Sequence, residues 1–217
     1  MCIRDRYRAA PMGRAVMIRK RTSHLIVILE EIEGLKFYIF PYVFFQVNSK
    51  MFGKLLFKLK ENLEPEFSNN VYDLYSGVGT ISLYLSNYCR NVIGFEIMDE
   101  AVNSAELNRK INGVDNCKFV KCDVKKVFSD VSDMRSKYGK PETIILDPPR
   151  AGVHRKVLKG VLEIYPDIII YVSCNLESLC DDLRMLTKNY RISKIQVFDF
   201  FPQTYHIETM VKLCKYK

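Results

Sequence analysis

The feature that most restricts the fold of this chain is a regular alternation of strand-like and helix-like segments after residue 70. Short runs rich in β-branched and aromatic residues alternate with longer segments whose apolar residues recur at helical spacing. The predicted strands cover 70–77, 91–97, 117–124, 142–149 and 167–174, and the predicted helices cover 80–89, 99–113, 125–139, 154–166 and 176–189. This alternation predicts parallel βαβ units with right-handed crossovers and a sheet covered by helices on both faces.

The end of the chain departs from that alternation. The segments 192–201 and 206–216 are two successive strands, and only the residues PQTY separate them. So short a connection predicts a hairpin, which makes the last strand antiparallel. The sequence therefore predicts an α/β fold with a Rossmann-like sheet and an antiparallel last strand.

The N-terminal part of the sequence has a different pattern. Residues 14–40 contain short strand-like runs ended by charges or by Gly34, which is typical of the tail of a small β-rich region. After Pro41, Asn48 or Ser49 can cap a helix. The apolar residues expected on one face of that helix are Met51, Phe52, Leu55, Leu56 and Leu59.

The first six residues, MCIRDR, need separate treatment. They resemble the translation of a transposon end used in preparing sequencing libraries, so we expect residues 1–6 to be a non-native scar and Met1 not to be the true start. The expected organisation is this scar, a β-rich remnant at 7–42 and an α/β catalytic domain at 43–217.

Composition restricts the partners and the compartment. Residues 1–60 hold 12 basic and 4 acidic side chains, whereas the remainder holds 21 of each. Such an excess fits a phosphate-rich partner, and it fits an ordinary basic surface equally well. No apolar run is long enough to cross a bilayer, so we expect a soluble, cytoplasmic protein. The seven cysteines include no CxxC pair, which predicts neither a disulfide framework nor a metal site.

The segment YDLYSGVGTISL joins a strand to a helix through a glycine turn. Gly77 and Gly79 let a ligand approach backbone N–H groups, and Glu96 ends the next strand, where an acidic residue typically accepts hydrogen bonds from ribose hydroxyls. A nicotinamide dinucleotide fits this pattern. Asp73 and Asp123 better suit S-adenosylmethionine, because its amino group and sulfonium favour carboxylates and it has no pyrophosphate.

Two further strand ends carry chemistry. The fourth strand ends in DPPR, residues 147–150, where two prolines fix an extended backbone that suits a wall for a flat base while Asp147 points into the crevice. Cys174 follows the fifth strand and precedes a helix. A helix dipole is expected to lower the pKa of a thiol there, unless the acidic residues of that helix face it. Taken alone, Cys174 also fits a core thiol.

Five motifs in this order resemble the RNA uracil carbon-5 methyltransferases, which make 5-methyluridine in tRNA or large-subunit rRNA. The motifs are FFQVN (44–48), DLYSGVGT (73–80), LDPPRAGV (146–153), YVSCN (171–175) and FPQTYHIE (201–208), and the resemblance covers about residues 15–217. It implies a Rossmann-like, S-adenosylmethionine-dependent methyltransferase that acts on RNA as a monomer. Members often carry an RNA-binding barrel, and some carry an iron–sulfur cluster; neither is recognisable here.

The resemblance also implies roles for individual residues. Cys174 matches the nucleophile that adds to uracil carbon 6, and Glu208 matches the base that removes the carbon-5 proton. Combined with the glycine-loop pattern, it gives these cofactor-binding residues: Gln46, Asp73, Tyr75, Gly77, Gly79, Thr80, Glu96, Asp123 and Asp147. The residues expected against the extruded base are Phe44, Phe45, Pro148 and Arg150. Ser76 stands where many members have cysteine, which removes no reacting group.

Other functions remain open at this point. RNA cytosine carbon-5 methyltransferases resemble a two-cysteine design with a second cysteine directly after the fourth-strand proline, where Pro149 stands here. Exocyclic-amine methyltransferases share the two-proline turn but usually have an aromatic residue at the place of Arg150, and they need no nucleophile. A catalytically weak RNA-binding fragment is the alternative from a different class.

Overall fold

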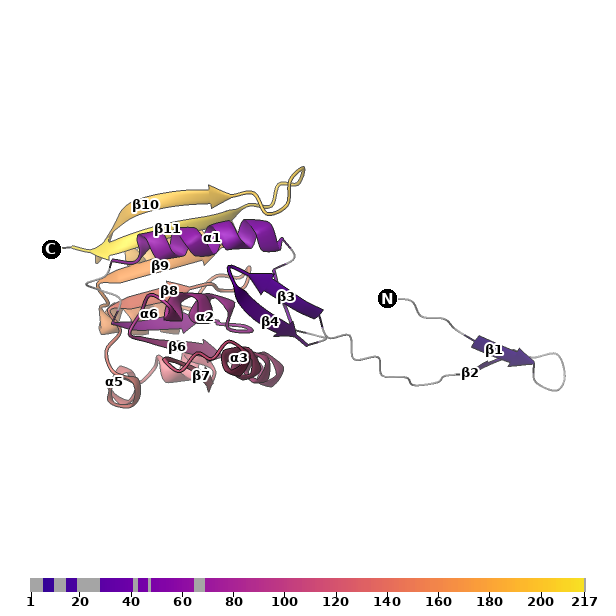
Figure 1. The fold of residues 1–217 in the computed structure, drawn as a ribbon. Helices are drawn as coiled ribbons and strands as arrows, with labels where there is room; N and C mark the ends of the chain where they lie inside the picture. Colours follow the sequence, from indigo (N-terminus) through magenta and orange to yellow (C-terminus); the bar gives the residue numbers. More distant parts are fainter. Residues whose placement is uncertain are drawn as a thin grey trace.

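The structure is a computed structural model that describes residues 6–9, 15–18, 28–40, 43–46, 48–64 and 69–216. A seven-stranded sheet forms its centre, with helices on both faces (Figure 1). The strands are β5 (Asn70–Leu74), β6 (Asn91–Glu96), β7 (Cys117–Lys121), β8 (Thr143–Leu146), β9 (Ile168–Ser173), β10 (Tyr190–Phe198) and β11 (Glu208–Lys215). The predicted α/β fold with a mainly parallel sheet is confirmed.

The order of strands across the sheet is β10-β11-β9-β8-β5-β6-β7. The pairs from β9 to β7 are parallel, whereas β11 runs antiparallel to both β9 and β10, as predicted for the last strand. The chain leaves β5 towards β6 and β7 and then returns to β8 on the other side of β5. Such a reversal opens a crevice at the carboxyl ends of the strands, which is where ligands bind in open α/β sheets.

Side chains alternate between the two faces of each strand, so each face has its own core. One core joins alternate residues of the sheet to α1 (Ser49–Asn62), α2 (Thr80–Ser86) and α3 (Asp99–Ile111). The other joins the remaining strand residues to α4 (Val124–Val127), α5 (Val131–Tyr138), α6 (Arg155–Ile164) and α7 (Leu176–Leu186). The parallel strands are therefore covered on both sides, which explains their nearly continuous apolar sequences.

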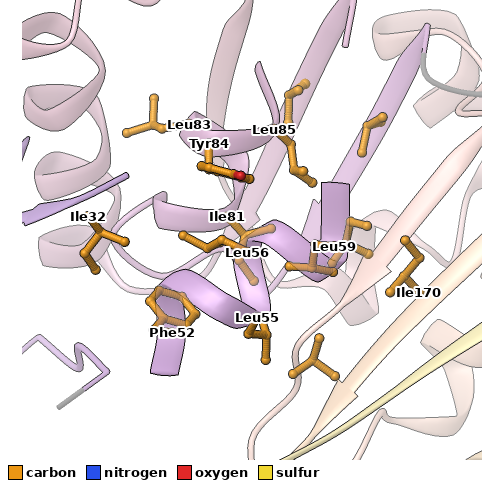
Figure 2. Packing of buried hydrophobic residues seen from close by; sticks show 14 of the residues in the cluster. Ile32, Phe52, Leu55, Leu56, Leu59, Ile81, Leu83, Tyr84, Leu85 and Ile170 are labelled. Atoms are coloured by element: carbon orange, nitrogen blue, oxygen red, sulfur yellow. The ribbon is translucent and has the colours of Figure 1, made fainter. Parts of the chain in front are cut away.

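Helix α1 begins as predicted. The Asn48 side chain accepts a hydrogen bond from the Met51 N–H at 3.0 Å and so caps the helix. Its buried apolar face packs against α2 and against Ile170 of β9, as Figure 2 shows. Asn48 also donates from Nδ2 to the carbonyl of Phe200 at 3.1 Å, which ties the start of α1 to the loop between β10 and β11.

Two smaller antiparallel sheets precede α1. Strands β1 (Arg6–Ala9) and β2 (Ala15–Ile18) pair with each other, as do β3 (Ile28–Ile32) and β4 (Leu35–Ile39). The β3–β4 hairpin contributes Ile32, Leu35 and Phe37 to the core shared with α1 and α2. The predicted β-rich region is therefore present, and its second hairpin packs on the α/β domain. The domain boundary at 42 stays a prediction.

Three details differ from the sequence-based prediction. The predicted helix 125–139 is two helices, because the Asp130 side chain accepts from the Asp133 N–H and starts α5 anew after α4. The connection between β10 and β11 is longer than PQTY and covers 199–207. Strand β1 was not predicted. Residues 1–5 of the proposed scar lie outside the described residues. Within the described part of the chain, no helix is long and apolar enough to cross a membrane.

Candidate active site

The glycine loop between β5 and α2 is held by backbone hydrogen bonds to the end of β6. The N–H groups of Tyr75 and Ser76 both donate to the Phe95 carbonyl, at 2.9 and 3.1 Å. Tyr75 has a φ of 68°, in the left-handed region that non-glycine residues rarely adopt. This strained turn directs the chain from the buried strand across the edge of the sheet and into α2.

The two glycines of the loop meet different surroundings. Gly77 has a φ of 54°, and a Cβ built there would meet nothing within 4 Å. Gly79 has a φ of 84°, and a Cβ there would stand 2.4 Å from Phe119 Cζ. Gly79 is thus required by packing against Phe119 as well as by its backbone conformation. A ligand has room beside Gly77, whereas the corresponding space at Gly79 is filled by the protein.

Glu96 is the acceptor that organises the loop. Its Oε2 accepts from the Gly77 N–H at 3.0 Å, and its Oε1 accepts from the N–H groups of Ile97 and Met98 at 2.7 and 2.9 Å. A carboxylate can accept about four hydrogen bonds, so capacity remains for a ligand hydroxyl. The predicted ribose acceptor is therefore also a structural clamp between β6 and the loop.

A cleft of about 340 Å³ opens beside this clamp. It collects three of the predicted cofactor residues, Tyr75, Glu96 and Asp123. Asp123 follows β7 and caps α4 by accepting from the Lys125 N–H at 2.9 Å. The remaining lining residues are Phe95, Ile97, Cys122, Val124, Lys125, Pro149, Ala151, Gly152 and His154. The volume and the mixture of apolar walls with a few polar groups are those of a small-molecule site.

Asp73 and Thr80 lie behind the loop rather than on the lining of this cleft. Asp73 is fully buried in β5, where its Oδ2 accepts from the Ser82 hydroxyl at 2.6 Å while Oδ1 has no partner. Burial raises the pKa of Asp73 to about 7. Thr80 is the buried first residue of α2. The unpartnered Oδ1 is the feature of Asp73 that fits a ligand donor.

The side of the cleft opposite Glu96 is built by the segment after β8. Pro149, Ala151, Gly152 and His154 belong to it. Asp182 of α7 holds this segment in place. Its Oδ2 accepts from the Val153 N–H at 2.8 Å and from the Tyr171 hydroxyl at 2.6 Å. Asp182 is one of the acidic residues of the helix after Cys174. Its carboxylate binds the segment after β8 instead of facing the thiol.

Sequence reasoning missed most of the residues that line this cleft. The signal for Ile97 was its place directly after the acidic strand end; it is 58% exposed in the cleft. Ala151, Gly152 and His154 follow DPPR, and Gly152 has a φ of 78°, which marks a turn. Nothing in the local sequence showed that this turn closes over the cofactor side of the sheet.

Cys174 and Glu208 come together through strand register. Ser173 of β9 pairs with Thr209 of β11 in antiparallel register, so the next position on each strand is Cys174 and Glu208. Cys174 is partly buried and Glu208 is 7% exposed. Asn175 follows the thiol and caps α7, and its Nδ2 donates to the Arg150 carbonyl at 3.0 Å. The structure thereby joins the ends of β8, β9 and β11.

The pKa values around this thiol differ from the prediction. Burial raises the pKa of Cys174, the charge of Glu208 raises it further, and Asp147 adds to the effect. The net shift of the Cys174 pKa is therefore upward, opposite to the lowering expected from the helix N-terminus. The opposing carboxylates are these two groups from neighbouring strands, and not Glu177 or Asp181 of the helix.

The two carboxyl groups beside the thiol are themselves shifted. Burial raises the pKa of Glu208 to about 7. Burial, the charge of Glu208 and the charge of Asp73 raise the pKa of Asp147 to about 8. Both groups therefore titrate near neutral pH, which is the range that suits proton transfer.

The predicted base-contacting residues occupy different environments. Phe44 is 76% exposed, whereas Phe45 packs on the core with its ring centroid 6.0 Å from that of Phe37. Pro148 is buried, and Arg150 is exposed, with Nη2 3.4 Å from His206 Nδ1. Gln46 is partly buried in the segment that leads into α1. Phe44 and Arg150 are thus the two of this set that a ligand can reach directly.

Comparison with known proteins agrees with this arrangement. The family model for tRNA (uracil-5-)-methyltransferases matches residues 31–216. The chain belongs to that family. The resemblance to this family noted from the sequence is thereby confirmed.

Similar curated proteins support the same assignment. An uncharacterized RNA methyltransferase of Clostridium tetani is 43% identical over 187 residues, which are 86% of this chain and 40% of that protein. One from Bacteroides thetaiotaomicron is 38% identical over 198 residues, which are 91% of this chain and 42% of that protein. The chain therefore spans about two fifths of the length of these relatives.

Solved structures extend the comparison. A Pyrococcus abyssi tRNA (uracil-54, C5)-methyltransferase in complex with S-adenosyl-L-homocysteine has a TM-score of 0.76 and 37% identity, covering 86% of this chain and 44% of that one. The ligand of that protein, S-adenosyl-L-homocysteine, is what S-adenosylmethionine becomes after methyl transfer. A tRNA m1G37 methyltransferase of M. jannaschii has a TM-score of 0.66 at 15% identity, covering 89% and 58% of the two chains, and shows the fold alone.

Proposed function

We propose that this chain transfers a methyl group from S-adenosylmethionine to carbon 5 of a uridine in RNA. The observation that carries the proposal is the register that sets Cys174 and Glu208 at adjoining ends of β9 and β11, next to Asp147 at the end of β8. A thiol and a carboxyl group that face one crevice fit a reaction in which a nucleophile adds and a base removes a proton. Family membership supports the same chemistry.

The residues of the cleft fit S-adenosylmethionine. Glu96 and Asp123 retain acceptor capacity for ribose hydroxyls, and Phe95, Ile97 and Pro149 supply flat or apolar walls for an adenine ring. The open side of Gly77 allows the ligand to approach the backbone. Asp73 is buried behind the loop, and through its unpartnered Oδ1 it remains the proposed acceptor for the amino group of the methionine part. Gln46, Tyr75, Gly79, Thr80 and Asp147 remain proposed members of this site.

When bound, the cofactor supplies a methyl carbon that a sulfonium makes electrophilic. Uracil carbon 5 is too weak a nucleophile to attack it, so the Cys174 thiolate first adds to carbon 6. The electrons of the carbon 5–carbon 6 double bond then reside on an enolate, and carbon 5 takes the methyl group. The pair from the methyl–sulfur bond stays on sulfur, which leaves S-adenosylhomocysteine.

Glu208 completes the reaction in this proposal. Its carboxylate takes the proton from carbon 5, the carbon–hydrogen electrons re-form the double bond, and the bond from carbon 6 to Cys174 breaks. A pKa of about 7 lets the group accept a proton and release it again near neutral pH. Phe44 and Arg150 would contact the extruded base, and Phe45 and Pro148 remain proposed members of this site.

The substrate assay separates this function from its alternatives. The chain is incubated with tRNA, with large-subunit rRNA and with S-adenosylmethionine labelled in the methyl group, and the RNA is digested to nucleosides. Label in 5-methyluridine supports the proposal. Label in 5-methylcytidine or in a methylated exocyclic amine contradicts it. Cofactor binding at equilibrium without methyl transfer to any of these RNAs supports the catalytically weak fragment.

A further inference from the structure

The loop between β10 and β11 gathers aromatic side chains beside the proposed reaction site. The Tyr205 ring lies 4.2 Å from the His206 ring, centroid to centroid, and Phe201 meets the same His206 edge-on at 6.3 Å. We call Phe201, Tyr205 and His206 the aromatic cluster. Its last member, His206, stands two residues before Glu208, and Figure 1 shows the loop projecting beyond the end of the sheet.

Tyr205 is the ring of the aromatic cluster most open to solvent, whereas His206 is partly buried. Tyr205 is 86% exposed, the most of any large apolar or aromatic side chain whose burial the structure describes. An exposed ring at a loop tip contributes little to the core. Its face is therefore free to meet a ligand.

The loop is nevertheless held in one shape. The Thr204 hydroxyl donates to the Phe201 carbonyl at 2.8 Å, and the His206 N–H donates to the Thr204 Oγ1 at 3.2 Å. Asn48 donates to the carbonyl of Phe200 at 3.1 Å, which anchors the base of the loop to α1. A loop ordered before binding loses less conformational entropy when a ligand stacks on it.

Arg150 supplies a positive charge beside the aromatic cluster. The loop itself, residues 199–207, contains one acidic side chain, Asp199 at its start, and no lysine or arginine. Arg150 Nη2 lies 3.4 Å from His206 Nδ1, which places a guanidinium beside the rings. A guanidinium beside exposed rings suits a phosphate next to a stacked base.

We propose that the aromatic cluster is a stacking site for an unpaired RNA base that neighbours the target uridine. This inference rests on the proposed function. Aromatic side chains bind single-stranded RNA by stacking because every base has a flat face, and extrusion of one base leaves its neighbours unstacked. A base held on Tyr205 would fix the strand so that the next nucleotide enters the crevice at Cys174.

Binding of a fluorescent oligonucleotide tests the proposal without requiring catalysis. The probe is a single-stranded RNA nonamer with a central uridine flanked by 2-aminopurine, whose fluorescence is quenched on stacking. Tyr205→Ala should weaken binding roughly 5- to 100-fold and abolish the quenching, since a stacked base contributes about that much. Tyr205→Phe keeps the ring and should bind within about twofold of the wild type.

Tyr216→Ala is the matched control. Tyr216 is also exposed, at 52%, but it follows the opposite end of β11 from Glu208. It should bind the probe as the wild type does. Wild-type binding and quenching by Tyr205→Ala would overturn the proposal, and so would absence of probe binding by the wild type. Neither result affects the covalent chemistry assigned to Cys174, which is measured separately on long RNA.

Discussion

The glycine loop and the surroundings of Cys174 lie at the same edge of the sheet, yet they treat their polar groups in opposite ways. At the loop, Glu96 is surrounded by three backbone N–H donors. At the thiol, Asp147 and Glu208 lie near each other, and burial raises the pKa of both. In the first region the Glu96 carboxylate has hydrogen-bond partners, which suits a binding site. The second holds carboxyl groups whose raised pKa values lie near neutral pH, the range that suits proton transfer.

Replacing the base should produce the largest change on the reactive side. Glu208→Gln should lower turnover about 10²- to 10⁴-fold, because the carbon-5 proton then has no acceptor. Methyl transfer precedes that step, so a methylated covalent complex should accumulate on ordinary uridine RNA. Denaturing electrophoresis with methyl-labelled cofactor detects it. Turnover at the wild-type rate would show that Glu208 is not the base.

Alanine substitutions at the two glycines of the loop test the binding region. Gly79→Ala should lower the free energy of unfolding by about 2–4 kcal/mol, because the new Cβ meets Phe119 and the backbone has a positive φ. Gly77→Ala is the control, with positive φ but open space, and should cost about 1 kcal/mol. Denaturant unfolding of both variants measures the difference. Equal losses would mean that Phe119 does not fill the space behind Gly79.

The pH dependence of stability should show the raised carboxyl pKa values around Cys174. The folded-state pKa of Asp147 is raised from 3.8 to about 8, so between those pH values the folded protein holds a proton that the unfolded chain has released. Stability must then fall as pH rises through this range. Asp147→Asn removes that contribution and should raise the Tm at pH 8 by roughly 3–6 °C, with no gain at pH 4.

Thermal unfolding from pH 4 to pH 8 provides the measurement. Asp123→Asn is a suitable comparison, because Asp123 belongs to the cleft and caps α4 instead of facing the thiol. It should not flatten the fall in Tm. A wild-type Tm that does not decline towards pH 8 would contradict the raised pKa values.

The sequence predicted best those features of the fold that depend on residues close together in the chain. The alternation of apolar runs predicted the sheet, and the Asn48 cap predicted the start of α1, because both depend on neighbouring residues. The break at Asp130 was missed because buried Phe128 and Val131 continue an apolar pattern across it. Local capping chemistry ended the helix there in spite of that pattern.

The same contrast holds for the candidate site. The residues of the glycine loop could be predicted from the sequence because they are contiguous. The direction in which the Cys174 pKa shifts could not be predicted in this way. It depends in part on Glu208, which β11 brings beside the thiol through strand pairing. Ile97 and His154 were missed for the same reason, since the cleft exists only when the segment after β8 closes opposite β6.

Trapping with 5-fluorouridine RNA tests the central claim most directly. Fluorine at carbon 5 cannot leave as a proton, so the enzyme should stop as a complex in which Cys174 is bonded to carbon 6 of the methylated base. We expect a stable adduct with the wild-type chain in the presence of S-adenosylmethionine and none with Cys174→Ala, while Cys180→Ala, which alters an exposed thiol of α7, forms it normally. An adduct that persists in Cys174→Ala would contradict the account.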